Sequence, residues 1–449
     1  MCCRQHAARP AACFVAENPA RMRLLYNILF PLGFLLCAPF YFWKLLRRGN
    51  WRNGFGQRFG GYGGLREKLK GQRVLWLHAV SVGEANLAVQ LVEALRREFP
   101  DWTFVVSTIT TTGMGELEKK LPGDVHRVYF PIDWLPFVRS AFRAINPAAI
   151  VLVEAEIWPN LFWEARRADA PMHLINTRLT GKSFRGYRRF GCLFKPLFAS
   201  LRGVGVHSDA DAGRLAELGC DRAAITVTGN MKFDGADLAS TLDARVLLRE
   251  LGVPDDALVL VGGSTFDGEE LLLCEWLPRW RKDFPDLFLV IVPRHFERTG
   301  ALLEQLKSTG LRIARRTAME DAPENPDVLL VDTTGELTAF FEVATLVFMG
   351  KSLTAQGGQN PIEPAALGKA ILFGPFMQNF RPVVASLLAA KGAIQVADEA
   401  ELGEKVLELL GVSEKRDALG AAAQGMVEAN KGATQRTAEM LGQTLRALS

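Results

Sequence analysis

The segment HAVSVGEA (78–85) carries a carboxylate at a place where proton transfer is possible. It follows the apolar run 74–78, and Glu84 opens a helical pattern whose apolar residues recur at intervals of three and four. A carboxylate at the end of a strand can accept a proton from a substrate hydroxyl. The Ser81-x-x-Glu84 spacing is also that of a capping box, in which the glutamate only stabilises the helix start. Spacing alone leaves both interpretations open.

A second acidic segment and a lone lysine could complete such a site. Glu154 and Glu156, in VEAEIWPN (153–160), follow another apolar run, and in an extended chain their side chains would point the same way. Lys232, in GNMKFD, could stabilise an anionic substrate or leaving group. The alternatives are a solvated strand end for the glutamates and a linker surface for the lysine.

Two segments of the second half are suited to phosphate. Pro293-Arg294 ends an apolar run, and an arginine there can bind phosphate or carboxylate in bidentate fashion. In GGQNPIEP (357–364), small residues would let backbone amides approach a phosphate, and a helix opening near Pro361 would add a positive dipole. Glu363 could accept protons from ribose hydroxyls. An ordinary loop with a helix cap is the alternative.

The stretch 171–208 is basic, contains no Asp or Glu, and has aromatic residues interleaved. Its basic residues are Arg178, Lys182, Arg185, Arg188, Arg189, Lys195 and Arg202. Such a composition suits an anionic membrane surface or a phosphorylated lipid. The aromatic residues could equally belong to the core, and binding of single-stranded nucleic acid is a weaker option. A neighbouring membrane anchor favours lipid.

That anchor is predicted from the uncharged run 24–43, which is about one bilayer width long as a helix. Lys44, Arg47, Arg48 and Arg52 follow at once, so the positive-inside rule keeps the remaining chain in the cytosol. No cleavage site follows, which favours an uncleaved anchor. Two prolines in the run leave a buried or interfacial helix as the alternative. Residues 1–21 are expected to be disordered.

The remaining chain alternates short apolar runs with helical patterns, which indicates parallel sheets covered by helices. The runs of the first half are 74–78, 104–108, 149–154, 172–176, 204–207 and 225–229, and those of the second half are 258–262, 287–293, 328–332, 346–350 and 370–374. The pattern breaks around 230–255. We therefore expect two doubly wound α/β domains, with ligands in the crevice between them, outside the carboxyl ends of the strands.

Composition and missing signatures exclude several classes of protein. The chain has 449 residues and a net charge of +4, too little by itself to indicate nucleic acid. Seven cysteines without a CxxC pair argue against a disulfide framework or a cysteine zinc site, and no HExxH occurs. A P-loop ending at 350–352 would need glycine where Thr345 stands, and neither GxGxxG nor GxSxG is present. Nucleotide-sugar transferases remain as a natural class.

Taken together, the segments HAVSVGE, EAEIWPN, GNMKFD, VPRH, GEL (335–337) and GGQNPIEPAALGK resemble the 3-deoxy-D-manno-octulosonic acid (Kdo) transferases of lipopolysaccharide synthesis. The resemblance covers nearly the whole chain from Met22. It implies the GT-B fold, in which two Rossmann-like domains face a central cleft. It also implies transfer of Kdo from CMP-Kdo to the lipid A precursor, lipid IVA, at the cytoplasmic face of the inner membrane.

The resemblance also implies residue roles. Glu84 matches the catalytic base, and Glu154 and Lys232 match residues that support the transition state. The segments matching the CMP-binding residues contain Pro293, Arg294, Gly335, Glu336, Leu337, Gly357, Gly358, Gln359 and Asn360. Glu363 is similar to the acidic residue that holds a nucleotide ribose, and Gln359 stands where the family often has histidine.

The expected organisation is a disordered extension (1–21), an anchor (22–48), an acceptor-binding domain (49–235) and a CMP-Kdo-binding domain (236–449). No cofactor or metal is expected, because the single DxD triplet, 209–211, lies at a helix start where acids serve as caps. A UDP-sugar transferase acting on another lipid and a non-catalytic, membrane-bound nucleotide-binding protein are the alternatives.

Overall fold

The computed structural model describes residues 19–47, 52–154, 156–235 and 242–449. The predicted disorder of 1–21 falls almost wholly outside these residues, and its last three residues, 19–21, belong to a helix. The described chain forms two compact units. One comprises the chain up to Gly235 together with Lys431–Ser449, and the other comprises Ala236–Asn430.

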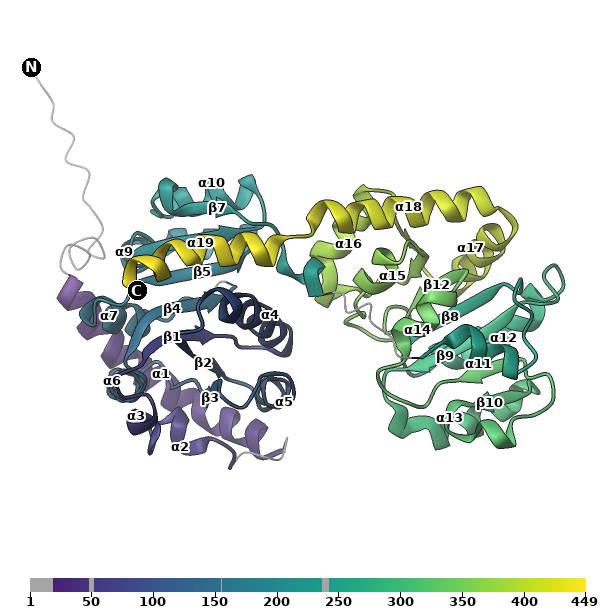
Figure 1. Cartoon of the computed structure of the whole chain (residues 1–449), viewed down its shortest axis with the longest axis horizontal. Coiled ribbons are helices and arrows are strands. Elements are labelled where there is room, and N and C mark those ends of the chain that lie inside the picture. The colour runs from purple at the N-terminus through teal and green to yellow at the C-terminus, as the bar shows by residue number, and fades with distance from the viewer. Residues whose placement is uncertain (1–18, 48–51, 155, 236–241) are drawn as a thin grey trace, which may run out of the picture. The chain divides into compact units, whose positions relative to one another are not determined.

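The first unit contains a seven-stranded parallel sheet in the order β3-β2-β1-β4-β5-β6-β7 (Figure 1). Its strands are β1 (Arg73–His78), β2 (Trp102–Thr108), β3 (His126–Tyr129), β4 (Pro147–Val153), β5 (Met172–Thr177), β6 (Leu201–Val206) and β7 (Ile225–Val227). The order of the strands reverses between β1 and β4. In open sheets of this type, ligands bind outside the carboxyl ends of the strands at such a reversal.

Helices cover this sheet, which is why its central strands read as continuous apolar runs rather than alternating ones. They are α2 (Phe55–Arg58), α3 (Leu65–Lys68), α4 (Val82–Glu98), α5 (Thr111–Lys120), α6 (Leu135–Ile145), α7 (Pro159–Arg167), α8 (Gly181–Arg189), α9 (Gly191–Phe198), α10 (Asp209–Glu217) and α19 (Ala433–Leu448). Two separate apolar clusters form the core. Trp76 and Phe142 belong to one, and Leu77 and Leu91 to the other.

The second unit repeats this architecture with the strand order β10-β11-β9-β8-β12-β13-β14, which reverses between β8 and β12. Its strands are β8 (Val259–Thr265), β9 (Phe288–Pro293), β10 (Ile313–Arg315), β11 (Val328–Leu330), β12 (Leu346–Met349), β13 (Ala370–Phe373) and β14 (Ile394–Gln395). Its helices are α11 (Ala244–Glu250), α12 (Glu269–Trp280), α13 (Thr299–Leu306), α14 (Leu337–Val343), α15 (Ile362–Ala366), α16 (Arg381–Ala389), α17 (Glu399–Gly411) and α18 (Ser413–Asn430). Two doubly wound α/β domains were expected, and the structure contains both.

The expected assignment of 236–449 to the second domain is wrong at its C-terminal end. Helix α19 belongs to the first unit and contacts α4 and β6 there (Figure 1, yellow helix). Leu441 and Leu445 are buried in the core of that unit. The apolar spacing of α19 indicates an amphipathic helix but does not indicate which sheet it covers, so the sequence could not place it.

The first described helix, α1 (Pro19–Arg47), contains the predicted anchor. Its segment Arg21–Phe40, 20 residues long, is apolar and long enough to cross a membrane. Large apolar side chains are exposed along it, and Leu36 is 84% exposed. The end of the predicted anchor, Arg48, lies outside the described residues.

The position of α19 leads to a prediction about stability. Leu441 is 1% exposed and Leu448 is 38% exposed, although both lie on the same helix. Leu441→Ala should therefore lower the free energy of unfolding of the first unit by about 2–5 kcal/mol. Leu448→Ala, the matched control, should change it by less than about 1 kcal/mol. Denaturant titration of both variants measures the difference, and equal effects would show that α19 does not cover the core.

Candidate active site

Glu84 lies in the first turn of α4, directly after β1, and its side chain is buried. The capping box that the spacing predicts is formed in part, because the Glu84 side chain accepts the amide of Val80 rather than that of the cap residue, Ser81. The Glu84 amide donates to Ser81 Oγ at 3.3 Å, while Ser81 Oγ donates to Glu84 Oε1 at 2.9 Å and the Val80 amide donates to Oε2 at 2.7 Å. These bonds fix the carboxylate at the strand end. Glu84 therefore stabilises the helix start, and its carboxylate can still accept a proton.

Glu154 follows β4, the neighbour of β1 at the reversal of strand order, and so lies at the same edge of the sheet as Glu84. Its backbone has φ of 62°, a left-handed conformation that is uncommon for a residue with a side chain. Such strain persists only where surrounding contacts impose it, and it concentrates at functional sites. The expectation that Glu154 and Glu156 point the same way is wrong in its premise, because the chain is not extended at Glu154.

Lys232 reaches this edge from a distant part of the sequence. Its Nζ lies 3.1 Å from Glu154 Oε1. The short helix η3 (Met231–Gly235) that carries it is fixed at both ends. At the start, Asn176 Oδ1 accepts the Met231 amide at 2.9 Å. At the end, Asp234 accepts the amides of Gly432 at 2.6 Å and Thr434 at 2.5 Å. The first unit thus brings together Glu84, Glu154 and Lys232.

Burial and neighbouring charges shift the pKa values of Glu84 and Glu156. Burial raises the pKa of Glu84, the nearby Glu154 raises it further, and the Val80 amide and Lys232 lower it. Burial raises the pKa of Glu156 to about 7, with Glu84 adding to the rise, while a hydrogen bond from Trp158 Nε1 at 3.0 Å opposes it. The raised pKa of Glu84 increases the affinity of its carboxylate for a proton, which is the property that a general base requires.

In the second unit, a buried glutamate connects the two strand ends at the reversal. The Glu269 carboxylate, fully buried, accepts the amides of Phe266 (2.9 Å), Lys351 (2.6 Å), Ser352 (2.9 Å) and Leu353 (3.0 Å). Phe266 follows β8, and the other three follow β12. Glu269 therefore sets the position of the loop after β12 relative to the end of β8.

Arg294 follows β9, next to β8, and its amide donates to the Thr265 carbonyl at 2.9 Å. Its side chain is exposed, and its guanidinium makes no hydrogen bond or ion pair with the residues that the structure describes. Pro293, the last residue of β9, is buried. An arginine with its donors available at the carboxyl end of a central strand suits a phosphate.

Gly357 and Gly358 differ from expectation in what their amides do. The Gly357 amide donates to Gln378 Oε1 at 2.8 Å and to the Phe376 carbonyl, and the Gly358 amide donates to the Lys351 carbonyl at 2.8 Å. Both amides are thus already bonded within the chain. Glycine is needed here because φ is 125° and 73°. At Gly358, moreover, a Cβ atom would lie 2.4 Å from the Met377 sulfur.

Glu336 also has partners within the chain. Its carboxylate forms an ion pair with Arg316 at 2.9 Å and accepts a hydrogen bond from Thr333 Oγ1. Gly335 is exposed with φ of 86°, and Leu337 opens α14 near Gly263 of β8. The backbone of this turn, rather than the Glu336 carboxylate, is what remains open to a ligand.

The last predicted segment, 359–363, leads into α15. Asn360 Oδ1 accepts the Ile362 amide at 3.2 Å, so Asn360 supports the helix start rather than projecting freely. Gln359 is half-buried, and Glu363 lies half-buried in the first turn. The segments at 293–294, 335–337 and 357–360 follow β9, β11 and β12 respectively, and all belong to the carboxyl edge of one sheet.

Several residues of these two edges were not predicted as site residues from the sequence. Lys351 follows β12 with φ of 53°, and its Nζ lies 5.1 Å from the centre of the Phe266 ring. Its position directly after an apolar run was a usable signal. Glu156 was noted for its spacing only. Glu269 reads as an ordinary acid in a first helical turn, so no signal in the sequence distinguished it.

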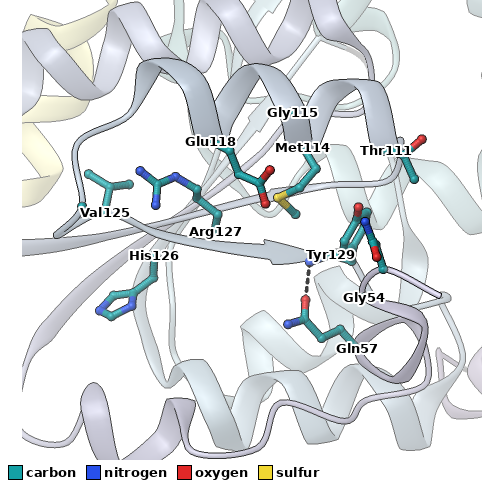
Figure 2. A pocket seen from close by; sticks show the side chains of 12 residues that line it. Gly54, Gln57, Thr111, Met114, Gly115, Glu118, Val125, His126, Arg127 and Tyr129 are labelled. Atoms are coloured by element: carbon teal, nitrogen blue, oxygen red, sulfur yellow. Dashed lines mark hydrogen bonds between the residues drawn. The ribbon is translucent and has the colours of Figure 1, made fainter. Parts of the chain in front are cut away.

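A hollow of about 630 Å³ in the first unit lies elsewhere, beside β3 and α5 (Figure 2). Thr111, Met114, Glu118 and Tyr129 line part of it, and none of the predicted site residues does. The nearby Arg127 guanidinium is bonded to carbonyls at the end of α5. We therefore place the chemistry at the Glu84 edge, where charges converge. Among the described residues, no group of three His, Cys, Asp or Glu side chains could hold a metal ion.

Known proteins resemble the chain over most of its length. Residues 53–235 match the family described as 3-deoxy-D-manno-octulosonic-acid transferase (kdotransferase). A 3-deoxy-D-manno-octulosonic acid transferase of Bordetella pertussis is 32% identical over 413 residues, which are 89% of this chain and 94% of the relative. One from Haemophilus influenzae is 28% identical over 417 residues, or 91% and 96% respectively.

The fold has relatives among solved structures. The UDP-GlcNAc 2-epimerase from Neisseria meningitidis, bound to UDP-GlcNAc, superposes with a TM-score of 0.56 at 14% identity, covering 83% of this chain and 100% of that one. This likeness concerns the fold alone. With the two observed sheets, it confirms the predicted GT-B class of two Rossmann-like domains.

The raised pKa of Glu156 predicts how stability depends on pH. Its folded-state pKa is about 7 against an ordinary 4.5, so the folded protein holds a proton that the unfolded chain has lost. The free energy of unfolding should therefore fall as the pH rises from 4.5 to about 7. Glu156→Gln should remove of the order of 2 kcal/mol of this fall. Denaturant titrations across the window measure it, with exposed Glu250→Gln as control; parallel curves for wild type and Glu156→Gln would contradict the assignment.

Proposed function

Because the chain belongs to the family of 3-deoxy-D-manno-octulosonic acid transferases, and is thus a glycosyltransferase, we propose that it moves Kdo from CMP-Kdo to the lipid A precursor, lipid IVA. The observation that carries this proposal is the position of Glu84. Its carboxylate is buried at the reversal of strand order, is held by two hydrogen bonds, and has a raised pKa.

In the proposed reaction, Glu84 acts as general base. An acceptor hydroxyl oxygen attacks the anomeric carbon of Kdo, and its proton passes to the Glu84 carboxylate. The bond between that carbon and the CMP phosphate oxygen breaks, and CMP leaves with the electron pair. Burial supports this role, because it raises the affinity of the carboxylate for the incoming proton.

Lys232 and Glu154 have supporting roles in this mechanism. The donor carries the Kdo carboxylate and the CMP phosphate, and the Lys232 ammonium offsets negative charge as the leaving group departs. Glu154 orients that ammonium through their 3.1 Å ion pair. The ties from Asn176 and Asp234 to η3 keep the lysine in place, so less reorganisation is needed during the reaction.

We propose that CMP binds at the carboxyl edge of the second sheet. Arg294 meets the phosphate, because its guanidinium is exposed and its donors are available. Lys351, which was not predicted as a site residue, adds a second positive charge for the phosphate. The site is shaped by Pro293, the backbone of Gly335–Leu337 and the segment from Gly357 to Asn360. Glu363 accepts a hydrogen bond from a ribose hydroxyl. Glu336 contributes by fixing its own turn.

The acceptor is proposed to approach along α8. This helix follows the carboxyl end of β5, at the same edge as Glu84. Its Lys182, Arg185, Arg188 and Arg189 are exposed, whereas Tyr187 packs against Phe194 and Phe198 in the core. Basic residues at this edge suit the phosphates of a lipid headgroup. We propose that the enzyme works at the cytoplasmic face of the inner membrane and binds no nucleic acid.

Incubation of the purified protein with CMP-Kdo and tetra-acylated lipid A precursor, followed by mass spectrometry, tests the proposal. We expect a mass increase of the lipid by whole Kdo units and release of CMP. Transfer from a UDP-hexose instead would show that the proposed donor, CMP-Kdo, is wrong. No transfer from either donor, with CMP still bound, would indicate a non-catalytic nucleotide-binding protein.

Glu84→Gln separates the catalytic role from the capping role. Glutamine also forms a capping box, so the fold and CMP binding should remain while kcat falls by about 10²–10⁴-fold. Ser81→Ala is the matched control. It removes the cap and costs about 0.5–2 kcal/mol of stability. It also removes one of the two hydrogen bonds to the Glu84 carboxylate, but the carboxylate itself remains, still held by the Val80 amide. Transfer kinetics and thermal unfolding of both variants measure the difference. If Ser81→Ala abolishes transfer and Glu84→Gln does not, Glu84 is only a cap.

We also expect transfer to proceed without a metal cofactor. Arg294, Lys351 and Lys232 supply the positive charge that a divalent ion would otherwise provide. Enzyme treated with EDTA and then desalted should retain its rate of CMP release. Loss of that rate, with recovery on addition of Mg²⁺ alone, would contradict this expectation.

A further inference from the structure

The N-terminal part of α1 is fixed to the first unit by polar side chains. Arg23 forms an ion pair with the fully buried Glu164 of α7. The Tyr26 hydroxyl donates to Asp133 at 2.8 Å, and Asn27 Nδ2 donates to Asn160 Oδ1 at 2.9 Å. Positions 23, 26 and 27 lie on one face of a helix.

Withdrawing α1 would remove one polar partner from each of three buried side chains. Asp133, Asn160 and Glu164 are buried, with at most 1% of their surface exposed. A buried polar group that loses a hydrogen bond is destabilising, because it has already lost its bonds to water. Asp133 and Glu164 retain other hydrogen bonds or ion pairs within the unit, but each also uses a partner from α1. The contacts therefore oppose any arrangement that takes this end of α1 away from the unit.

The covered face continues along the helix. Residues 22, 23, 26, 27, 30, 31, 34 and 38 are partly covered, whereas the positions between them are mostly exposed. The exposed stripe contains Leu24, Leu25, Ile28, Leu29, Leu32, Leu35, Leu36, Phe40 and Trp43. From Leu24 to Trp43 this stripe is about 29 Å long. One side of α1 is thus partly covered and contacts the first unit near the start of the helix, and the other is an uncharged apolar surface.

The chain is attached to the same unit again shortly after α1. Gln57 Oε1 accepts the Tyr129 amide at 2.7 Å, as the dashed line in Figure 2 shows. The Phe59 ring contacts Phe137 of α6 at 5.5 Å between centroids. Helix α6 begins at Leu135, whose amide lies 3.3 Å from Asn27 Oδ1. The chain therefore contacts α6 twice, through Asn27 within α1 and through Phe59 shortly after it.

This double attachment is incompatible with a helix that crosses the bilayer. From Asn27 to Arg47, α1 is about 30 Å long, which is the thickness of the hydrocarbon core. If α1 spanned, one attachment would lie on each side of the membrane. The segment between Arg47 and Gln57, with Arg48 and Arg52, would then have to cross back through hydrocarbon. Charged residues are costly there.

We infer that α1 lies in the plane of the membrane interface, with its polar face on the first unit and its leucine-rich stripe in the lipid. This inference deepens the membrane association in the proposed function and rests on it. It replaces the predicted crossing by a one-sided attachment. The partner is a lipid bilayer surface, because the stripe carries no charge and the sequence that follows it is rich in basic residues.

Spin labels along the exposed stripe test the inference in the full-length protein. In a variant without Cys2, Cys3, Cys13 and the exposed Cys37 and Cys192, single cysteines replace Leu24, Leu32 or Phe40. The labelled proteins are bound to vesicles of phosphatidylethanolamine and phosphatidylglycerol. Collision rates with oxygen and with a water-soluble nickel chelate then report the depth of each label. Val246, exposed and apolar in the second unit, gives the matched control position.

We expect the three α1 labels at one shallow depth of about 5–10 Å and the Val246 label in water. A profile with Leu32 deepest, near the bilayer centre at about 15 Å, and both ends near the surface would overturn the inference in favour of a crossing helix. Labels shielded from lipid in a stable dimer would overturn it in favour of a second copy. Kdo transfer is assayed on the same samples. Inactive protein with a flat profile would contradict the proposed function only.

Discussion

The reversal of strand order in a parallel sheet is the constraint on which the site of each unit depends. At β1 and β4 the connections leave in opposite directions, so the loops after these strands part and leave their carboxyl ends accessible. Glu84 follows one of these strands and Glu154 follows the other. In the second unit the strand order reverses in the same way between β8 and β12, and Glu269 connects the accessible ends of these two strands. Residues distant in sequence thus meet because of topology, and local hydrogen bonds then set their orientation.

The supporting contacts explain why the charged groups of the first unit are fixed rather than solvated. Asn176 and Asp234 hold the short helix that carries Lys232, and Asp234 does so through the start of α19. The C-terminal helix therefore contributes to the site although none of its residues belongs to it. On another side of the unit, Asp133 and Glu164 bind α1. The same domain thus organises both the proposed chemistry and the proposed contact with lipid.

The sequence predicted the domain type and most strands, because central strands buried on both faces read as apolar runs. The strands without a prediction, β3, β10 and β14, lie at sheet edges and are short. The sequence also brought Glu84, Glu154 and Lys232 to attention, since each stands near the end of an apolar run. It could not predict that the amides of Gly357 and Gly358 bond within the chain, or that Glu336 pairs with Arg316, because such partners depend on tertiary packing. The same limit applies to α1, because the role of its polar residues at 23, 26 and 27 becomes clear only from their tertiary contacts, such as those with α7.

Glu84 is the proposed base, and Glu154 and Lys232 shift its pKa in opposite directions. The most direct measurement is kcat/KM for transfer as a function of pH in wild type, Glu154→Gln and Lys232→Met. A base must be deprotonated, so the rate falls on the acid side of its pKa. Glu154 raises the pKa of Glu84 and Lys232 lowers it. The acid limb should therefore move to lower pH in Glu154→Gln and to higher pH in Lys232→Met. Limbs that stay in place, or move together, would contradict the account.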